Sequence, residues 1–174
     1  HRDLHSFPTR RSSDLLDSDE MKELLTDVIT GDALDDNKKP YARRSNMRDT
    51  AIIALLGGTG IRVSELVGID LNDIDWEHNC IRIIRKGGNE DIVYFGDELH
   101  RYLEDYINYE REPGDDKEKA LFVASRKDKG RLTVRSVERI VSKYGAATIP
   151  SKHLSSKKVK VPKIQPLQIG RAHV

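Results

Sequence analysis

An arginine and a glutamate three residues apart stand at the start of a short predicted helix. Gly60 lets the chain turn tightly before Arg62, which then lies in the first helical turn, with Glu65 on the same face. Backbone N–H groups at a helix start favour an anion, and a planar guanidinium can grip two oxygens of one phosphate. These residue types suit phosphate binding. An ordinary surface ion pair is the default alternative at this spacing.

A lysine opens the loop of a predicted β-hairpin. Segments 79–85 and 91–95 carry β-branched residues and are predicted to pair as strands, and the loop between them, 86–90, contains two glycines. Lys86 stands at the tip of this hairpin, a flexible position from which a cationic group can reach into a cleft. A solubilising lysine in a turn is the common alternative.

Apolar periodicity predicts the helices that would position these residues. It indicates helices over 17–29, 47–56 and 97–109, a short helix over 62–67, and a helix that follows Thr133 as its N-cap. The polar segment 31–44 is predicted to be a loop, and 120–124 a short buried run. The fold class is therefore α+β and mainly α, with a small antiparallel β-hairpin or sheet.

Local signals predict where these helices begin and end. Asp17 with Glu20 forms a capping box before the first helix. Ser45 or Asn46 can cap the second helix, and the Gly57-Gly58 pair is expected to end it.

Composition limits the classes of function. The chain has 174 residues, 37% hydrophobic and 34% charged, which fits one domain with a modest core. No apolar run is long enough for a transmembrane helix. The lone Cys80 excludes an internal disulfide, and the histidines share no metal-like spacing with it, so no metal is expected. Basic residues gather in 139–168 and acidic residues in 97–118, which fits a phosphate-facing surface or a solvated loop.

The segment 48–75, RDTAIIALLGGTGIRVSELVGIDLNDID, resembles the signature of the tyrosine recombinase (phage integrase) family. The hairpin at Lys86 and the stretch LFVASRKDKGRLTVRSVERIV, 121–141, continue the same pattern in the same order. The resemblance covers 16–168. It implies the helical catalytic domain of such an enzyme with its C-terminal part missing, acting on duplex DNA without cofactors, and a parent protein that is a homo-oligomer on DNA.

The resemblance also implies roles for the residues above. Family members cut DNA by in-line attack of a tyrosine on a backbone phosphate, which conserves the bond energy in a phosphotyrosine. Arg62 matches the first active-site arginine, and Glu65 matches the acid expected to hold its guanidinium. Lys86 matches the hairpin lysine that protonates the leaving 5′ oxygen. This chain departs from the family at Arg85, where glycine is usual.

Further basic residues lie between the short buried run and the last predicted helix, or at the start of that helix. They are candidates for contact with DNA phosphates, although a solvated loop fits most of them equally well: Arg126, Lys127, Lys129, Arg131 and Arg135.

The second half of the family's active site is not found in the sequence. The family has a His-x-x-Arg box, and Leu167 stands where its histidine is expected. None of the six tyrosines occupies a nucleophile position: Tyr41, Tyr94, Tyr102, Tyr106, Tyr109 and Tyr144. The chain is therefore expected to be inactive by itself. Its missing helices are expected to leave an apolar patch around Leu55, Val137 and Ile140.

Both ends of the chain differ in character from the rest. Residues 1–15 and 169–174 resemble translations of sequencing-library adaptor DNA, although disordered native tails are the alternative. The expected division is thus a tail over 1–15, a partial catalytic domain over 16–168 and a tail over 169–174. A non-catalytic DNA-binding module and a type IB topoisomerase-like enzyme remain alternatives. A prokaryotic or phage-encoded protein in the cytoplasm is expected.

Overall fold

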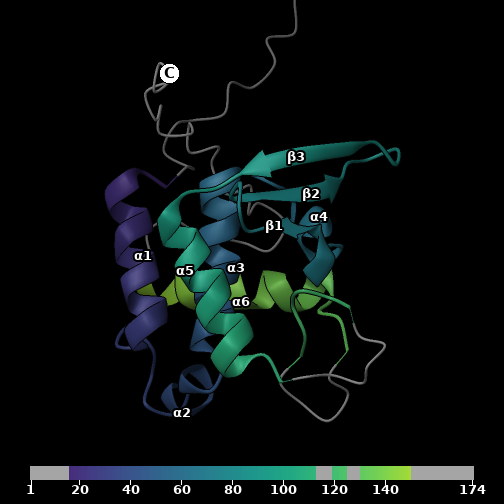
Figure 1. The fold of residues 1–174 in the computed structure, drawn as a ribbon. Helices are drawn as coiled ribbons and strands as arrows, with labels where there is room; N and C mark the ends of the chain where they lie inside the picture. Colours follow the sequence, from purple (N-terminus) through teal and green to yellow (C-terminus); the bar gives the residue numbers. More distant parts are fainter. Residues whose placement is uncertain (1–15, 113–118, 125–129, 150–174) are drawn as a thin grey trace, which may run out of the picture.

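Helix α3 (Asn46–Thr59) runs through the middle of the molecule, and the other helices are arranged around it (Figure 1). The computed structural model describes residues 16–112, 119–124 and 130–149. Every residue from 48 to 57 is buried, and those from 51 to 57 are apolar residues or glycine, so this part of α3 faces the core on all sides. It packs against α1 (Ser18–Thr30), α5 (Asp97–Asp105), the π-helical turn that follows α5 (Tyr106–Glu110) and α6 (Val134–Thr148).

The first helix follows its local signals. Oδ1 of Asp17 accepts hydrogen bonds from the backbone N–H groups of Asp19 and Glu20, both at 2.9 Å. The backbone N–H of Asp17 donates to Oε2 of Glu20 at 2.8 Å, which completes the predicted capping box. Gly31 ends the helix with a φ of 72°, a conformation that glycine adopts without strain.

Segment 31–44, predicted to be a loop, contains the short helix α2 (Lys39–Arg43), so this prediction is wrong for five residues. Pro40 lies in its first turn, where a fixed φ and a missing N–H cost nothing. Only Ala42 of this helix is buried. A single turn with one buried residue has too few positions to show a helical period.

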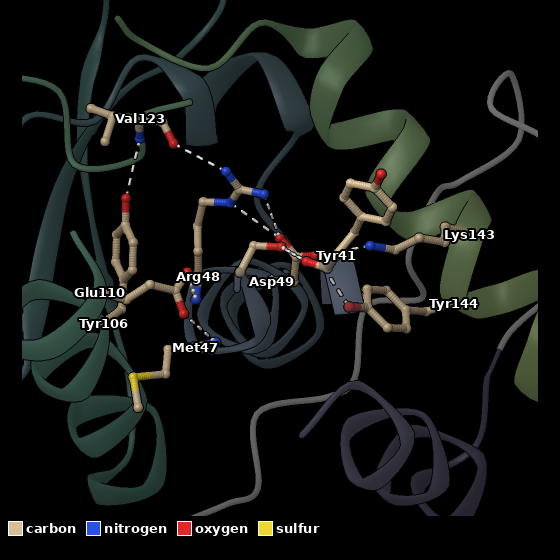
Figure 2. A network of polar contacts seen from close by, with 10 residues as sticks. Tyr41, Met47, Arg48, Asp49, Tyr106, Glu110, Val123, Lys143 and Tyr144 are labelled. Carbon is tan, nitrogen blue, oxygen red and sulfur yellow. Dashed lines mark hydrogen bonds and ion pairs between the residues drawn. The ribbon is translucent and has the colours of Figure 1, made fainter. Parts of the chain in front are cut away.

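The structure confirms one predicted end of α3 and not the other. Ser45 occupies the N-cap position, as predicted, but its side chain makes no capping hydrogen bond. Glu110, at the end of the π-helical turn, supplies the capping carboxylate instead. Its Oε2 accepts from the N–H of Met47 at 2.8 Å and its Oε1 from that of Arg48 at 3.2 Å (Figure 2). At the other end, α3 continues through the two glycines to Thr59, because Gly57 is buried and packing offsets its low helix propensity. Gly60 ends the helix with a φ of 67°.

The carboxyl group of Glu110 should make stability depend on pH. Burial, the largest effect, raises the pKa of Glu110 above its ordinary value of 4.5, although the N–H donors of Arg48 and Met47 oppose this. A raised acid pKa gives stability that is present below the unfolded-state pKa and is lost as pH rises through the folded-state pKa. The melting temperature of Glu110→Gln minus that of the parent chain should therefore increase as pH is raised from 4 to 7, because only the parent loses stability through this group. Glu104→Gln, at an exposed site on α5, is the control, and a pH-independent difference for Glu110→Gln would contradict this assignment.

The described part of the chain contains a three-stranded antiparallel sheet in the order β1-β2-β3, which confirms the predicted hairpin. The strands are β1 (Ile74–Asp75), β2 (Cys80–Ile84) and β3 (Glu90–Tyr94). Ile81 pairs with Val93 and faces the core. The strand β1 was not predicted, because two residues are too few to show alternation.

Helix α6 begins as predicted, since Oγ1 of Thr133 accepts from the N–H of Ser136 at 3.2 Å. The apolar patch expected around Leu55, Val137 and Ile140 is wrong: their exposed fractions are 0%, 0% and 8%. Helix α6 packs against α1, α3 and α4 (Val63–Val67), so the three side chains belong to one core. None of the helices in the described ranges is long and apolar enough to cross a membrane.

Candidate active site

Arg62 lies at the N-cap position of α4, one residue before the first helical turn in which it was predicted, with its side chain 67% exposed. The positive φ of Gly60 turns the chain out of α3, and the buried side chains of Ile61 and Leu66 anchor the turn on either side. The backbone N–H of Arg62 donates to Oε2 of Glu65 at 2.7 Å. The guanidinium is less tightly held, because its Nη1 lies 3.9 Å from Oε1 of Glu65. It is therefore anchored by its backbone and available to an anion in solvent.

Glu65 is not the surface residue that an ordinary helical ion pair would contain. Its side chain is only 3% exposed, and a buried carboxylate needs cationic or hydrogen-bonding partners. Oε2 accepts from the backbone of Arg62 and also from Nη1 of Arg85, at 3.1 Å. Among the described residues, no group donates a hydrogen bond to Oε1. Glu65 thus joins the start of α4 to the hairpin.

Arg85 makes this connection from the position directly after β2. Its Nε and Nη2 both lie 3.0 Å from Oδ2 of Asp91 on β3, while Nη1 contacts Glu65. The hydrogen bond from Arg85 lowers the pKa of the Asp91 carboxyl, and Asp91 in turn raises the pKa of Arg85. The sequence showed Arg85 only as a departure from glycine. The acids at 65 and 91 were the signal that could have identified its partners.

Lys86 follows directly and is exposed in the hairpin loop. The loop closes through hydrogen bonds from the N–H of Arg85 to the carbonyl of Asn89, at 2.7 Å, and from the N–H of Gly88 to the carbonyl of Arg85, at 3.0 Å. Gly87 and Gly88 have φ values of 93° and 85°, which other residues rarely adopt. Since α4 packs against β2 (Figure 1), Arg62 and Lys86 lie on neighbouring elements. Glu65 connects these elements, because it contacts Arg62 and also Arg85, the residue before Lys86.

The model of the phage integrase family matches residues 15–160. This chain belongs to the phage integrase family. The match confirms the family resemblance found in the sequence.

Relatives of known name agree with this membership. The chain is 36% identical to tyrosine recombinase XerC of Corynebacterium glutamicum over 129 residues, which are 74% of this chain and 41% of that protein. It is 35% identical to tyrosine recombinase XerS of Streptococcus uberis, covering 72% of this chain and 37% of that protein. The chain therefore spans about two fifths of the length of these curated relatives.

Solved structures confirm the predicted α+β, mainly α fold. The crystal structure of XerA recombinase superposes with a TM-score of 0.65 at 24% identity, covering 84% of this chain and 47% of XerA. The XerH site-specific recombinase, in a pre-cleavage complex with its difH substrate, gives a TM-score of 0.55 at 22% identity, covering 81% of this chain and 40% of XerH.

The five basic residues predicted to contact DNA phosphates differ from one another in where the structure places them. Arg126, Lys127 and Lys129 lie outside the described residues. Arg131 uses its guanidinium within the fold: Nη1 donates to the carbonyls of Val67 and Ile69 at 2.8 and 3.2 Å, and Nη2 pairs with Asp70. It thereby supports the end of α4. Arg135 is exposed in the first turn of α6, and its contact with phosphate stays a prediction.

A buried polar network was missed in the sequence. Figure 2 shows the guanidinium of Arg48 between Asp49 and the carbonyl of Val123. From α6, the Tyr144 hydroxyl and Nζ of Lys143 each reach Oδ2 of Asp49 at 3.2 Å (Figure 2). Burial first, and then Asp49, raises the pKa of Tyr144. The available signal was an arginine–aspartate pair at the start of an apolar helix. This network holds α6 against α3.

The described residues hold no cluster of three or more histidine, cysteine, aspartate or glutamate side chains arranged for a metal. Asp70, Asp73 and Asp75 serve as caps and turn residues: Asp73 accepts from the N–H of Asp70 at 2.8 Å, and Asp75 from those of Glu77 and His78 at 3.1 Å.

Proposed function

We propose that this chain is part of the catalytic domain of a site-specific tyrosine recombinase that cuts and rejoins duplex DNA. One observation carries the proposal: buried Glu65 contacts both Arg62 and Arg85, so an exposed arginine stands beside the hairpin that carries Lys86. The names of the XerC and XerS relatives support the same activity. Residues 16–168 would form this partial domain, with 1–15 and 169–174 as tails.

Each residue would have a defined part in the reaction. A tyrosine oxygen attacks the DNA phosphorus, the new P–O bond forms, and the bond to the 5′ oxygen breaks. Arg62 stabilises the negative charge that grows on the phosphoryl oxygens, and Gly60 provides the turn that exposes it. Lys86 gives its proton to the departing 5′ oxygen. We assign the attacking tyrosine to a segment outside this chain.

The partners follow from the same chemistry. Duplex DNA would lie across Arg62 and the hairpin, with Arg126, Lys127, Lys129, Arg131 and Arg135 as candidates for phosphate contacts. Arg131 is the weakest of these candidates because its guanidinium already binds the end of α4. Recombination joins two DNA sites, so the intact protein would act as a homo-oligomer on DNA. Its relatives from bacteria support a prokaryotic or phage-encoded protein, while a place in the cytoplasm and the expected lack of a cofactor stay predictions.

A substrate with a better leaving group tests the role of Lys86. In the full-length product of the gene, Lys86→Ala should slow covalent complex formation on a suicide duplex by about 100-fold, the usual scale for a general acid. A duplex with sulfur in place of the bridging 5′ oxygen should restore the rate, because a thiolate leaves without a proton. A normal rate on the oxygen duplex, or no recovery on the sulfur duplex, would remove Lys86 from this role.

A further inference from the structure

We propose that Arg85 is a positioning residue for Lys86, which it holds in place by joining the base of the hairpin loop to α4. We call Arg85 with Glu65 and Asp91 the Arg85 bridge. The inference rests on the proposed function, since it presumes that Lys86 donates a proton. Neither Arg85 nor Asp91 is required to touch DNA.

The contacts of the bridge span three elements. Arg85, directly after β2, contacts Oε2 of Glu65 on α4 at 3.1 Å and Oδ2 of Asp91 on β3 at 3.0 Å. One planar guanidinium therefore fixes both strands of the hairpin against one helix. Planarity matters, because a lysine ammonium is a point charge and lacks the rigid fork that meets two carboxylates.

The sheet register places these groups on one face. Ile83 pairs with Asp91 and has its side chain in the core. Paired residues have their side chains on the same face of a sheet, so the Asp91 side chain lies on the inner face of the hairpin. Alternation along the chain carries Arg85, two residues after Ile83, to the same inner face. That face meets α4, where Glu65 is buried. The bridge thus lies between the sheet and the helix.

The loop beyond the bridge has little to order it otherwise. Residues 86 to 90 are all exposed, and two of them are glycines with positive φ. Lys86 is attached directly to Arg85, so fixing Arg85 fixes the Cα position from which the lysine extends. Displacement of a reacting group by about 1 Å can cost up to about 100-fold in rate.

Arg85 is suited to positioning rather than to gripping phosphate. Its side chain is 37% exposed and has two carboxylates within 3.1 Å, whereas the Arg62 side chain is 67% exposed and lies 3.9 Å from Glu65. An approaching phosphate would have to displace Glu65 or Asp91 from Arg85. The structure therefore separates a phosphate-binding arginine from a hairpin-holding one.

The chain offers a matched control on the same hairpin. Arg82 in β2 also bridges two acids, with Nη2 2.6 Å from Asp73 and Nη1 2.8 Å from Glu90. Its register partner is the exposed Ile92, so it lies on the outer face, away from α4. Arg82→Ala removes as many ion pairs from the hairpin without disturbing the bridge.

The test measures covalent complex formation by the full-length gene product on oxygen and sulfur duplexes. Arg85→Gly should be about 10-fold slower than the parent on the oxygen duplex, within the range for a misplaced group, and should match the parent on the sulfur duplex. Arg85→Lys should recover part of the rate. Arg82→Ala should match the parent on both substrates. Hydrogen exchange on the present chain should show faster exchange of the Gly88 amide in Arg85→Gly.

The outcomes separate the two proposals. If Lys86→Ala recovers on the sulfur duplex but Arg85→Gly is slow on both substrates, or slow on neither, the positioning role of Arg85 is wrong while the proposed function stands. An equal defect in Arg82→Ala would also overturn it, because loss of any ion pair on the hairpin would then be enough. If Lys86→Ala does not recover, the proton-donor role fails, and the positioning inference that rests on it fails as well. Unchanged Gly88 exchange in Arg85→Gly would contradict the bridge itself.

Discussion

Replacing Arg62 with alanine in the full-length product of the gene should lower the rate of covalent complex formation by at least about 1,000-fold. Loss of one preorganised donor at a developing oxyanion costs about 100- to 1,000-fold, and a guanidinium supplies two such donors and a charge. The structure supports a large effect because Arg62 is exposed and its backbone is anchored through Glu65. The measurement is the yield of protein–DNA adduct over time on a suicide duplex.

Two further variants make the Arg62 result specific. Arg62→Lys keeps the charge but not the planar fork, and should recover only a small part of the rate. Arg101→Ala removes an exposed arginine from α5 and should react like the parent protein. The sulfur duplex should not rescue Arg62→Ala, because the arginine acts on the phosphoryl oxygens and not on the leaving group. Undiminished adduct formation by Arg62→Ala would remove this residue from the active site.

The parts of the site that could be predicted from sequence depend on local rules. Gly60, with a positive φ, ends α3 and turns the chain, and this turn places Arg62 at the start of the next helix. The hairpin follows from β-branched residues on both sides of a glycine-containing loop. Lys86 is the first residue of that loop, so its position at the tip follows from the hairpin. In each case the deciding residues lie within a few positions of one another.

The parts that could not be predicted depend on residues far apart in the chain. Glu110 caps α3 from 62 and 63 positions away, so no local pattern could reveal it. Lys143 and Tyr144 meet Asp49 across 94 and 95 positions. Arg131 looked like a loop cation, yet its guanidinium binds carbonyl groups at the end of α4. A charged side chain that serves the fold and one that serves DNA have the same appearance in a sequence.

Asp49→Ala should lower the free energy of unfolding of the present chain by about 3–5 kcal/mol, the range for removing one partner from a buried ion pair. Asp49 is 0% exposed, and its two carboxylate oxygens meet Arg48, Lys143 and Tyr144 (Figure 2). Alanine would remove the carboxylate that binds Nε and Nη2 of Arg48, a side chain only 10% exposed. At about 2–4 °C per kcal/mol for a chain of this size, the melting temperature should fall by about 10 °C.

Matched substitutions separate the buried charge from simpler losses. Asp36→Ala removes an aspartate that pairs with Lys39 at 2.9 Å but whose side chain is 94% exposed, and it should leave the melting temperature unchanged. Tyr144→Phe removes one hydrogen bond to Asp49 and should cost about 1 kcal/mol. A melting temperature for Asp49→Ala equal to that of Asp36→Ala would show that the network does not hold α6 to α3.

The position of the network also predicts what Asp49→Ala should leave intact. Asp49 lies in the first turn of α3, whereas Arg62 follows the other end of that helix. The contacts of Glu65 with Arg62 and Arg85 include no member of the network. Well below its melting temperature, Asp49→Ala should therefore leave the hydrogen-exchange rate of the Gly88 amide the same as in the parent chain. Fast exchange there would mean that the network and the candidate active site unfold together as a single unit.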